Sequence, residues 1–209
     1  GVRDQGRPSN WTLADFIDHP TAQQTDLSPR HVAALRIYTT HLFKYLNGPL
    51  RKTAVFGAGK RPHPLPTTMS DLAEGIKRLR AAYVAVEKGS ATMEAERRQM
   101  RLYRGMKMLD VGDTFMHERQ GGTEIAPMST TTELEVAVHY GLSPESLLFV
   151  LAIDNAVQMG ADVQWLSAFP AEAEVVFPPL TYLQPTGRVQ HIELGTNRFK
   201  VVEVTPHIA

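Results

Sequence analysis

The most constraining feature of this sequence is a change of hydrophobic periodicity near residue 100. Before that point apolar residues recur at helical spacing, and after it short apolar runs are separated by turn residues. Helices and strands that are segregated along a chain indicate an α+β fold rather than alternating βαβ units. We therefore expect a single domain over residues 1–209, with a mostly helical lobe over 1–99 and a β-rich core over 100–209.

The helical half contains two strong patterns. Ser28 and Pro29 form an N-cap pair that begins the first, and the stop signal Asn47-Gly48-Pro49 is expected to end it. The second pattern runs from near Ser70 to Gly89-Ser90. One or two helical turns are expected at Leu13, Phe16 and Ile17, before Pro20, and another short helix is expected over residues 92–99.

The second half contains runs of strand length bounded by turn residues. The expected strands are 100–106, 147–153, 174–177, 189–194 and 199–204. Gly195-Thr196-Asn197-Arg198 separates the last two and is typical of a hairpin. Residues 132–140 have the composition of a helix.

Composition excludes several classes of function. The chain has no cysteine, so disulfides, thiolate zinc sites and cysteine nucleophiles are excluded. Twenty-two basic residues balance twenty-two acidic ones, so we expect neither a nucleic-acid partner nor an anionic membrane surface. The longest apolar run, 147–153, falls far short of the roughly 20 residues that span a bilayer. The start at Gly1-Val2-Arg3 has no signal and reads as a soluble fragment of a longer chain, with the compartment left open.

Two other motifs do not support a function. Phe56-Gly57-Ala58-Gly59-Lys60 resembles a phosphate loop, but Arg61 stands where the Walker pattern needs Ser or Thr. Proline at 62 and 64 prevents a helix from starting there, so this segment is expected to be a turn. The eight histidines fall at no close ligand spacing, and no metal is expected.

A pair of carboxylates precedes an apolar run in the second half. Glu172 and Glu174, followed by Val175-Val176-Phe177, would point to one face of a strand, roughly 6–7 Å apart. Partial burial and mutual repulsion should raise the pKa of at least one of them. Paired carboxylates of this kind handle oxocarbenium-like centres in glycoside chemistry. The alternative is a solvated outer face on an edge strand.

Two further segments carry polar groups suited to ligand binding. Arg104 could bind a phosphate through its planar guanidinium, and Gly105 would let a ligand approach the backbone. Ser129-Thr130-Thr131 could orient a carboxylate or a ribose. The alternatives are a structural ion-pair arginine and an N-cap for the helix that begins near residue 132.

Taken in order, Arg104, Ser129 and Glu172-x-Glu174 resemble the mono-ADP-ribosyltransferase family of the arginine–serine–glutamate (R-S-ExE) type. Tyr103-Arg104-Gly105 is similar to the family's arginine motif, and Ser129-Thr130-Thr131 stands where it usually has Ser-Thr-Ser. The trailing Phe177-Pro178-Pro179 matches the end of its glutamate strand. Thr131 departs from the family serine but retains a hydroxyl. The resemblance covers residues 100–185 by motif and implies a two-sheet ADP-ribosyltransferase-like fold with an NAD-binding core.

The resemblance implies a role in NAD binding or cleavage for five residues. Arg104 would hold the phosphate and ribose of NAD, and the backbone at Gly105 would receive the nicotinamide carboxamide. Ser129 would support the catalytic glutamate and the nicotinamide ribose, with Thr130 beside it. Glu174 would bond a ribose hydroxyl and stabilise the oxocarbenium as nicotinamide leaves.

The same resemblance implies which residues would face the acceptor of the ADP-ribose group. Glu172 is tied to the choice of acceptor, and a glutamate at this position usually accompanies arginine acceptors. Phe169 occupies the place of an aromatic residue in the acceptor-facing loop, and Trp165 lies further upstream in the same segment.

The expected function is therefore a toxin-like mono-ADP-ribosyltransferase, an enzyme of the glycosyltransferase class. It would cleave NAD as a co-substrate, without a metal, and transfer ADP-ribose to a protein side chain. Arginine is the first expected acceptor. One alternative is an NAD glycohydrolase, which hands the ribosyl group to water. Another is a non-catalytic NAD-binding or regulatory module. No nucleic-acid or membrane partner is expected, and the oligomeric state and protein target are not assigned.

Overall fold

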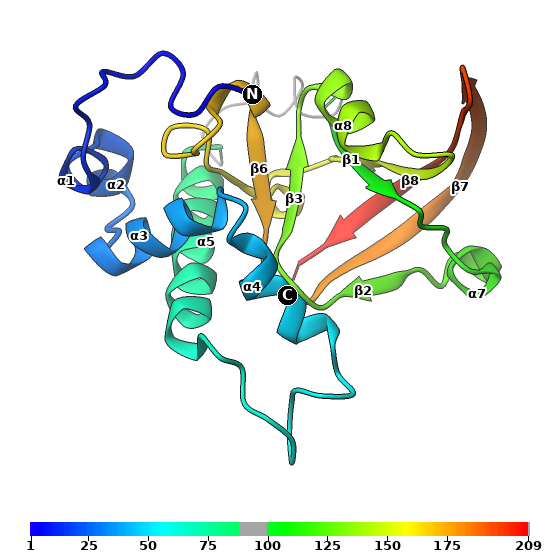
Figure 1. Cartoon of the computed structure of the whole chain (residues 1–209), viewed down its shortest axis with the longest axis horizontal. Helices are drawn as coiled ribbons and strands as arrows, with labels where there is room; N and C mark the ends of the chain where they lie inside the picture. Colours follow the sequence, from blue (N-terminus) through cyan, green and yellow to red (C-terminus); the bar gives the residue numbers. More distant parts are fainter. Residues whose placement is uncertain (88–99, 209) are drawn as a thin grey trace.

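The structure, a computed structural model, describes residues 1–87 and 100–208, with helices gathered beside a bent sheet (Figure 1). The helices before the first strand are α1 (Leu13–Ile17), α2 (Pro20–Gln24), α3 (Pro29–Tyr38), α4 (Phe43–Arg51) and α5 (Pro66–Glu87). The helix expected over 92–99 lies outside the described residues. None of the described helices is long and apolar enough to cross a membrane.

The strands begin at residue 101. They are β1 (Arg101–Lys107), β2 (Gly122–Glu124), β3 (Met128–Thr131), β4 (Glu145–Ala152), β5 (Ala161–Asp162), β6 (Glu174–Phe177), β7 (Thr181–Leu194) and β8 (Asn197–His207). Helices α7 (Asp113–Met116) and α8 (Leu134–Gly141) and the 3-10 turns η1 (His117–Arg119), η2 (Ala156–Gln158) and η3 (Pro170–Glu172) lie between them. The expected hairpin forms, and its strands β7 and β8 are longer than the sequence predicted.

All eight strands are joined in one hydrogen-bonded sheet in the order β2-β7-β8-β4-β1-β3-β6-β5. The sequence analysis expected two sheets, and the described strands form one. The join between β1 and β3 is narrow, because Tyr103 opposite Thr131 is its one residue pair. Strands β3 and β6 run in a different direction from β7 and β8 (Figure 1). The narrow join therefore lies where the sheet changes direction.

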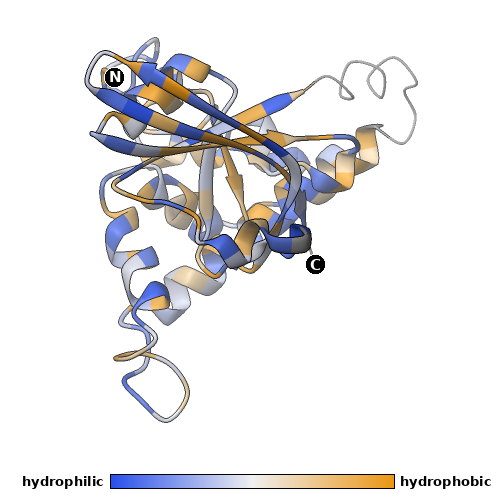
Figure 2. Cartoon of the chain, turned by 90° about the vertical axis from the view of Figure 1, so that its right-hand side faces the viewer, coloured by the Kyte–Doolittle hydropathy of each residue, from blue (hydrophilic) through white to orange (hydrophobic). Residues whose placement is uncertain are grey.

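The two larger apolar clusters hold the helices and the sheet together. Hydrophobic and hydrophilic residues alternate along the long strands (Figure 2). The first cluster packs α1 to α5 against the end of the sheet that carries β5 and β6, with Leu35 and Ile76 buried among its members. The second cluster lies between β1, β4, β6 and β8 and includes Leu102 and Phe177. Burying a Leu, Ile or Phe side chain stabilises a fold by about 1.5–3 kcal/mol. These clusters therefore fix β6 firmly between the helices and the rest of the sheet.

The first helical pattern of the sequence is two helices, not one. α3 ends at Tyr38 and α4 begins at Phe43, and Pro49 lies inside α4 rather than after it. The hydroxyls of Thr39 and Thr40 donate to carbonyls of the preceding turn, which offers the backbone an alternative to helical bonding. The helix therefore breaks at the threonines, and Asn47-Gly48-Pro49 does not end it.

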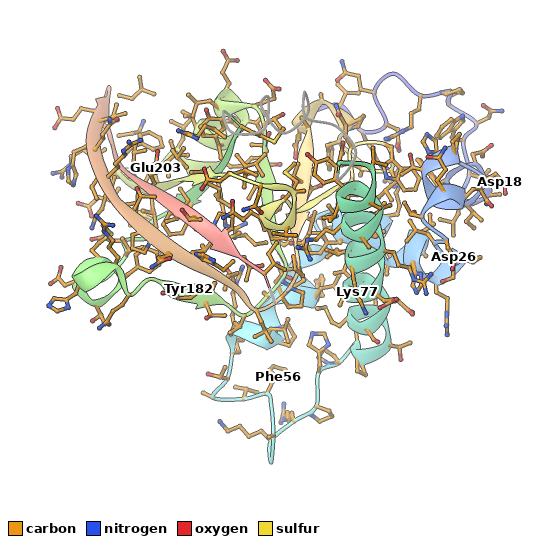
Figure 3. All side chains as sticks on the ribbon, turned by 180° about the vertical axis from the view of Figure 1, so that it is seen from behind. Asp18, Asp26, Phe56, Lys77, Tyr182 and Glu203 are labelled. Carbon is orange, nitrogen blue, oxygen red and sulfur yellow. The ribbon has the colours of Figure 1, made fainter. Side chains whose placement is uncertain are left out.

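The glycine-rich segment is a turn, as expected. Gly57 and Gly59 have positive φ angles of 122° and 71°, and the amide of Gly57 donates to the carbonyl of Arg61. The turn belongs to the projecting connection between α4 and α5, where Phe56 is labelled in Figure 3.

Candidate active site

Strand pairing brings the three sequence motifs together. β3 lies between β1 and β6, so the serine motif has the arginine motif on one side and the glutamate motif on the other. Within the register of β3 and β6, Ser129 lies opposite Val176 and Thr131 lies opposite Glu174. Motifs that are far apart in the sequence therefore meet on three neighbouring strands.

A chain of short hydrogen bonds links these motifs. The hydroxyl of Ser129 donates to Glu174 Oε1 at 2.6 Å, and Arg104 Nη1 donates to the carbonyl of Ser129 at 2.7 Å. Ser167 donates a longer bond of 3.4 Å to Glu174 Oε2. Glu174 is only 7% exposed, so these two hydroxyls orient a buried carboxylate.

Burial raises the pKa of Glu174 to about 7, and repulsion from Glu172 adds to the shift. The hydrogen bonds from Ser129 and Ser167 stabilise the carboxylate form and therefore oppose this increase in pKa. The sequence-based expectation that one of the two glutamates would have a raised pKa is therefore confirmed for Glu174. Burial also lowers the pKa of Arg104, but a guanidinium keeps its charge at neutral pH.

This pKa predicts how activity should depend on pH. If Glu174 acts as a carboxylate, kcat/KM for NAD cleavage should rise with pH through about 7 and level off above it. Ser129→Ala removes a bond that favours the charged form, so its rising limb should move to higher pH. Nicotinamide release measured between pH 5 and 9 checks both curves. A profile that is flat through pH 7 would contradict the proposed role of the carboxylate.

Glu172 does not lie on the strand with Glu174, which corrects the expectation of two carboxylates on one strand face. Glu172 ends the 3-10 turn η3, and Ala173 takes a left-handed conformation (φ 44°) before β6 begins. The hydroxyl of Tyr140 donates to Glu172 Oε1 at 2.8 Å. Burial and the neighbouring Glu172 carboxylate raise the pKa of Tyr140, so its phenol remains a donor.

A cavity of about 570 Å³ lies over the junction of β1, β3 and β6. Seven of the predicted site residues line it: Arg104, Gly105, Ser129, Thr130, Phe169, Glu172 and Glu174. The hydroxyl of Thr130 donates to the carbonyl of Val175 at 2.8 Å. Thr130 therefore holds β3 against β6 within the wall of the cavity.

Trp165, the eighth predicted site residue, does not line this cavity. Its ring stacks on His19 at 4.7 Å between centroids, and it packs against the helical cluster. Trp165 therefore helps to pack the helices against the β5–β6 loop, and its expected place on the acceptor side stays a prediction.

α3 and α4 supply a wall of the cavity that the sequence did not reveal. Tyr38 and Asn47 both donate to the carbonyl of Pro127, and Asn47 Oδ1 is buried with no hydrogen-bond partner among the described residues. Arg51 lines the same wall and pairs with Glu124 at 2.9 Å. In the sequence, Tyr38 lies within the first helical pattern, and Asn47 belongs to the expected stop signal. The available signal was Asn47, a polar residue next to the apolar Leu46 in this helical pattern.

The cavity combines cationic and anionic side chains. Among the residues that the structure describes, no cluster of three or more His, Asp or Glu side chains could hold a metal ion. The guanidinium groups of Arg104 and Arg51 and the carboxylates of Glu172 and Glu174 belong to residues that line the cavity. The site therefore offers cations for phosphate oxygens and carboxylates for a developing positive charge.

No protein-family model matches the chain, and no curated protein matches its sequence. Solved structures do match its fold. The ADP-ribosyltransferase HopU1 of Pseudomonas syringae pv. Tomato DC3000 has a TM-score of 0.62 at 18% identity, over 98% of this chain and 91% of its own. The chain therefore has the fold of the ADP-ribosyltransferases.

Two other structural neighbours were solved with a bound small molecule. The ADP-ribosyltransferase Vis of Vibrio splendidus, in complex with agmatine, has a TM-score of 0.50 at 20% identity, over 95% of this chain and 87% of its own. The ADP-ribosylating toxin BECa of Clostridium perfringens, with NADH, has a TM-score of 0.58 at 13% identity, over 93% of this chain and 48% of its own.

Proposed function

We propose that this chain is a mono-ADP-ribosyltransferase that cleaves NAD and transfers ADP-ribose to an arginine side chain of a protein. The observation that carries the proposal is the buried Glu174, oriented by Ser129 in a cavity beside Arg104. A carboxylate fixed in this way before the reaction stabilises most strongly a positive charge that develops next to it.

The cavity fits NAD in size and in chemistry. Its volume of about 570 Å³ lies within the usual range for small-molecule sites, and arginines hold phosphates through paired hydrogen bonds. The NADH found with BECa supports the same ligand class here.

The reaction that this arrangement supports breaks one bond and forms another. The bond between nicotinamide nitrogen and ribose carbon breaks, and its electron pair leaves with nicotinamide. The carboxylate of Glu174 stabilises the positive charge that this leaves on the ribose. An acceptor nitrogen then bonds to the ribose carbon, and Glu172 takes the proton that the nitrogen loses. Ser129 holds Glu174 in place throughout.

Arginine is the proposed acceptor because of the groups around Glu172. A guanidinium between Phe169 and Tyr140 would meet two aromatic rings and a carboxylate. Agmatine, which carries a guanidinium, was found bound to Vis. The proposal makes agmatine the first small acceptor to try.

Glu172→Gln should separate transfer from hydrolysis. The amide cannot take the acceptor proton, so transfer to agmatine should fall about 10²- to 10⁴-fold, whereas nicotinamide release into water should change little. Both rates can be followed with NAD labelled in the adenosine part. Glu135→Gln, on the exposed face of α8, is the matched control. An equal loss of both rates would contradict an acceptor role for Glu172.

The proposed function is tested by incubating the chain with labelled NAD, a cell lysate and agmatine. The expected result is free nicotinamide together with label on agmatine or on protein. Nicotinamide without label would make the chain a glycohydrolase. NAD binding without nicotinamide release would make it a binding module and refute catalysis.

A further inference from the structure

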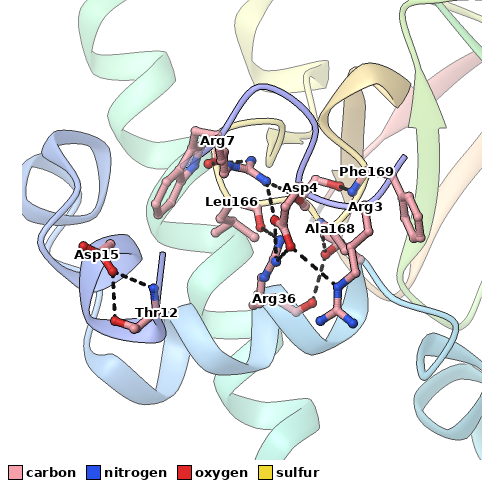
Figure 4. Close-up of polar contacts among 12 residues, drawn as sticks. Arg3, Asp4, Arg7, Thr12, Asp15, Arg36, Leu166, Ala168 and Phe169 are labelled. Atoms are coloured by element: carbon pink, nitrogen blue, oxygen red, sulfur yellow. Dashed lines mark hydrogen bonds and ion pairs between the residues drawn. The ribbon is translucent and has the colours of Figure 1, made fainter. Parts of the chain in front are cut away.

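The N-terminal segment and α3 hold the loop between β5 and β6 by its backbone. Five consecutive carbonyls of this loop, those of residues 164–168, accept hydrogen bonds from only three residues (Figure 4). Arg7 donates to Gln164, Trp165 and Ser167 at 2.6–2.9 Å. Arg36 donates to Leu166 at 2.7 Å, and the amide of Asp4 donates to Ala168 at 2.8 Å.

One carboxylate ties these donors to each other. Asp4 accepts two bonds from Arg36 Nη2, at 2.6 and 2.7 Å, and one from Arg7 at 2.9 Å. The Arg7 and Arg36 side chains are 9% and 15% exposed, and both guanidinium groups lie over the ring of Phe16. Partial burial alone would raise the pKa of Asp4, but Arg36 and Arg7 hold it below its usual value. Asp4, Arg7 and Arg36, called the clamp below, are therefore a charged group built into the fold.

The clamped loop leads directly into the acceptor side of the proposed active site. Its Ser167 donates to Glu174 and accepts from the amide of Phe169, which lines the cavity. A Cβ added to Gly1, at the start of the segment that carries Asp4, would lie 3.7 Å from Glu172 Oε1 and from the ring of Phe169. The N-terminal segment therefore extends from the clamp to the residues that would meet an acceptor.

We propose that Asp4, Arg7 and Arg36 are positioning residues that hold Phe169 and Glu172 where an acceptor side chain must enter. This inference rests on the proposed ADP-ribose transfer. Fixing the loop before the acceptor arrives saves the cost of ordering it during the reaction, and an error of about 1 Å in such positioning lowers rates by as much as a hundredfold. The clamp thus favours transfer over reaction with water.

The clamp acts separately from the group that drives NAD cleavage. Glu174 is held by the pairing of β6 with β3 and by the 2.6 Å bond from Ser129, and neither involves the clamp. The bond from Ser167 is the longer of its two at 3.4 Å. Loosening the loop should therefore reduce transfer while nicotinamide release continues.

Asp4→Asn tests this inference because it keeps the shape of the side chain and removes the charge that both guanidinium groups share. The kcat/KM for transfer to agmatine should fall about tenfold to a hundredfold, mostly through a higher KM for agmatine. Nicotinamide release into water should stay within about twofold of the wild-type rate. Arg36→Lys keeps the charge but loses the paired bonds to Asp4, and it should give a smaller change in the same direction.

Arg30→Ala is the matched control, because Arg30 lies on the same helix as Arg36 and is exposed, and its ion pair with Asp71 is long at 3.9 Å. It should leave transfer and hydrolysis unchanged. Equal falls in both rates for Asp4→Asn and Arg36→Lys, together with a lower Tm, would show a purely structural role and overturn the inference. Wild-type chain that releases no nicotinamide would instead refute the proposed function itself.

Hydrogen exchange of the wild-type chain gives a reading that does not need activity. The amides of residues 166–168, all hydrogen-bonded, should exchange as slowly as those of β6, and in Asp4→Asn they should exchange faster while β6 is unchanged. Rapid exchange of these amides in the wild-type chain would contradict a fixed loop.

Discussion

Replacing Glu174 with glutamine should lower nicotinamide release from NAD about 10²- to 10³-fold. The amide keeps the shape of the side chain, and its oxygen can still accept the hydrogen bond from Ser129. It lacks the negative charge that stabilises the ribose as nicotinamide leaves. The substitution also removes a buried ionisable group whose pKa of about 7 reflects the cost of burying its charge, so the fold should not suffer.

Two measurements on Glu174→Gln separate chemistry from binding. Nicotinamide release gives the rate of cleavage, and isothermal titration of NAD should give a dissociation constant close to that of the wild-type chain. Glu135→Gln, an exposed glutamate on α8, controls for the loss of one negative charge. A variant with wild-type rates of nicotinamide release would remove Glu174 from the proposed mechanism.

Gly105→Ala should destabilise the half of the chain that contains the sheet. A Cβ at this position would overlap the carbonyl oxygen of Ala137 and come within 2.8 Å of the amide nitrogen of Gly141, both on the backbone of α8. Either α8 or β1 must move, which costs about 3 kcal/mol or more and lowers Tm by roughly 6–12 °C. Because β1 carries Arg104 and α8 carries Tyr140, NAD cleavage should fall as well.

Gly48→Ala is the matched control for this prediction. Gly48 lies within α4, and a Cβ added to it would meet no atom within 4 Å outside its chain neighbours and the backbone of α4. Alanine favours a helix over glycine by up to about 1 kcal/mol, whereas Pro49 disfavours helical geometry for a residue with a Cβ before it. The two effects oppose each other, so this variant should melt close to the wild-type temperature. Thermal unfolding of both variants checks the pair. Equal melting temperatures for Gly105→Ala and the wild-type chain would show that α8 can move away from β1 at little cost.

Gly105 shows that a sequence can indicate the need for a glycine without revealing which neighbour requires it. The sequence analysis interpreted this glycine as room for a ligand, and the resemblance implied a contact with nicotinamide. The structure gives a further reason, since the glycine lets α8 pack directly against β1 while also lining the cavity. Both readings require a residue without a Cβ, so the sequence could not distinguish them.

Two of the three strands that carry the site were predictable, because their signals are local. β1 and β6 each combine an apolar run with a polar group, and both fall within one or two residues of the expected ranges. β3 consists of Met128 and three hydroxyl residues, and the sequence did not predict it as a strand. The pairing of β3 with β1 and with β6 brings Arg104, Ser129 and Glu174 together.

The features that the sequence did not reveal depend on distant partners. The break between α3 and α4 involves Thr39, whose hydroxyl also accepts from the amide of Ala168 in the β5–β6 loop. The clamp joins Asp4 and Arg7 to carbonyls near residue 166, about 160 residues further along the chain. Local propensity carries no information about such pairs, and only the folded chain reveals them.

The position of Glu172 also depends on a feature that the sequence pattern does not reveal, the backbone conformation of the residue after it. The sequence pattern predicted that Glu172 shares a strand with Glu174, but the left-handed Ala173 lies between them and β6 begins only at Glu174. The amide of Ala173 donates to the carbonyl of Pro170, which closes the turn η3. Glu172 consequently belongs to the loop side of the cavity, with Tyr140, and Glu174 belongs to the sheet.

The most direct test of the central claim is nicotinamide release from NAD by the wild-type chain and by Glu174→Gln, measured side by side with agmatine present. Nicotinamide release should be proportional to the amount of wild-type chain, labelled agmatine should be the second product, and both products should be lost in the variant. Absence of release from a folded wild-type chain that binds NAD, or equal release by the two chains, would refute the proposed ADP-ribose transfer.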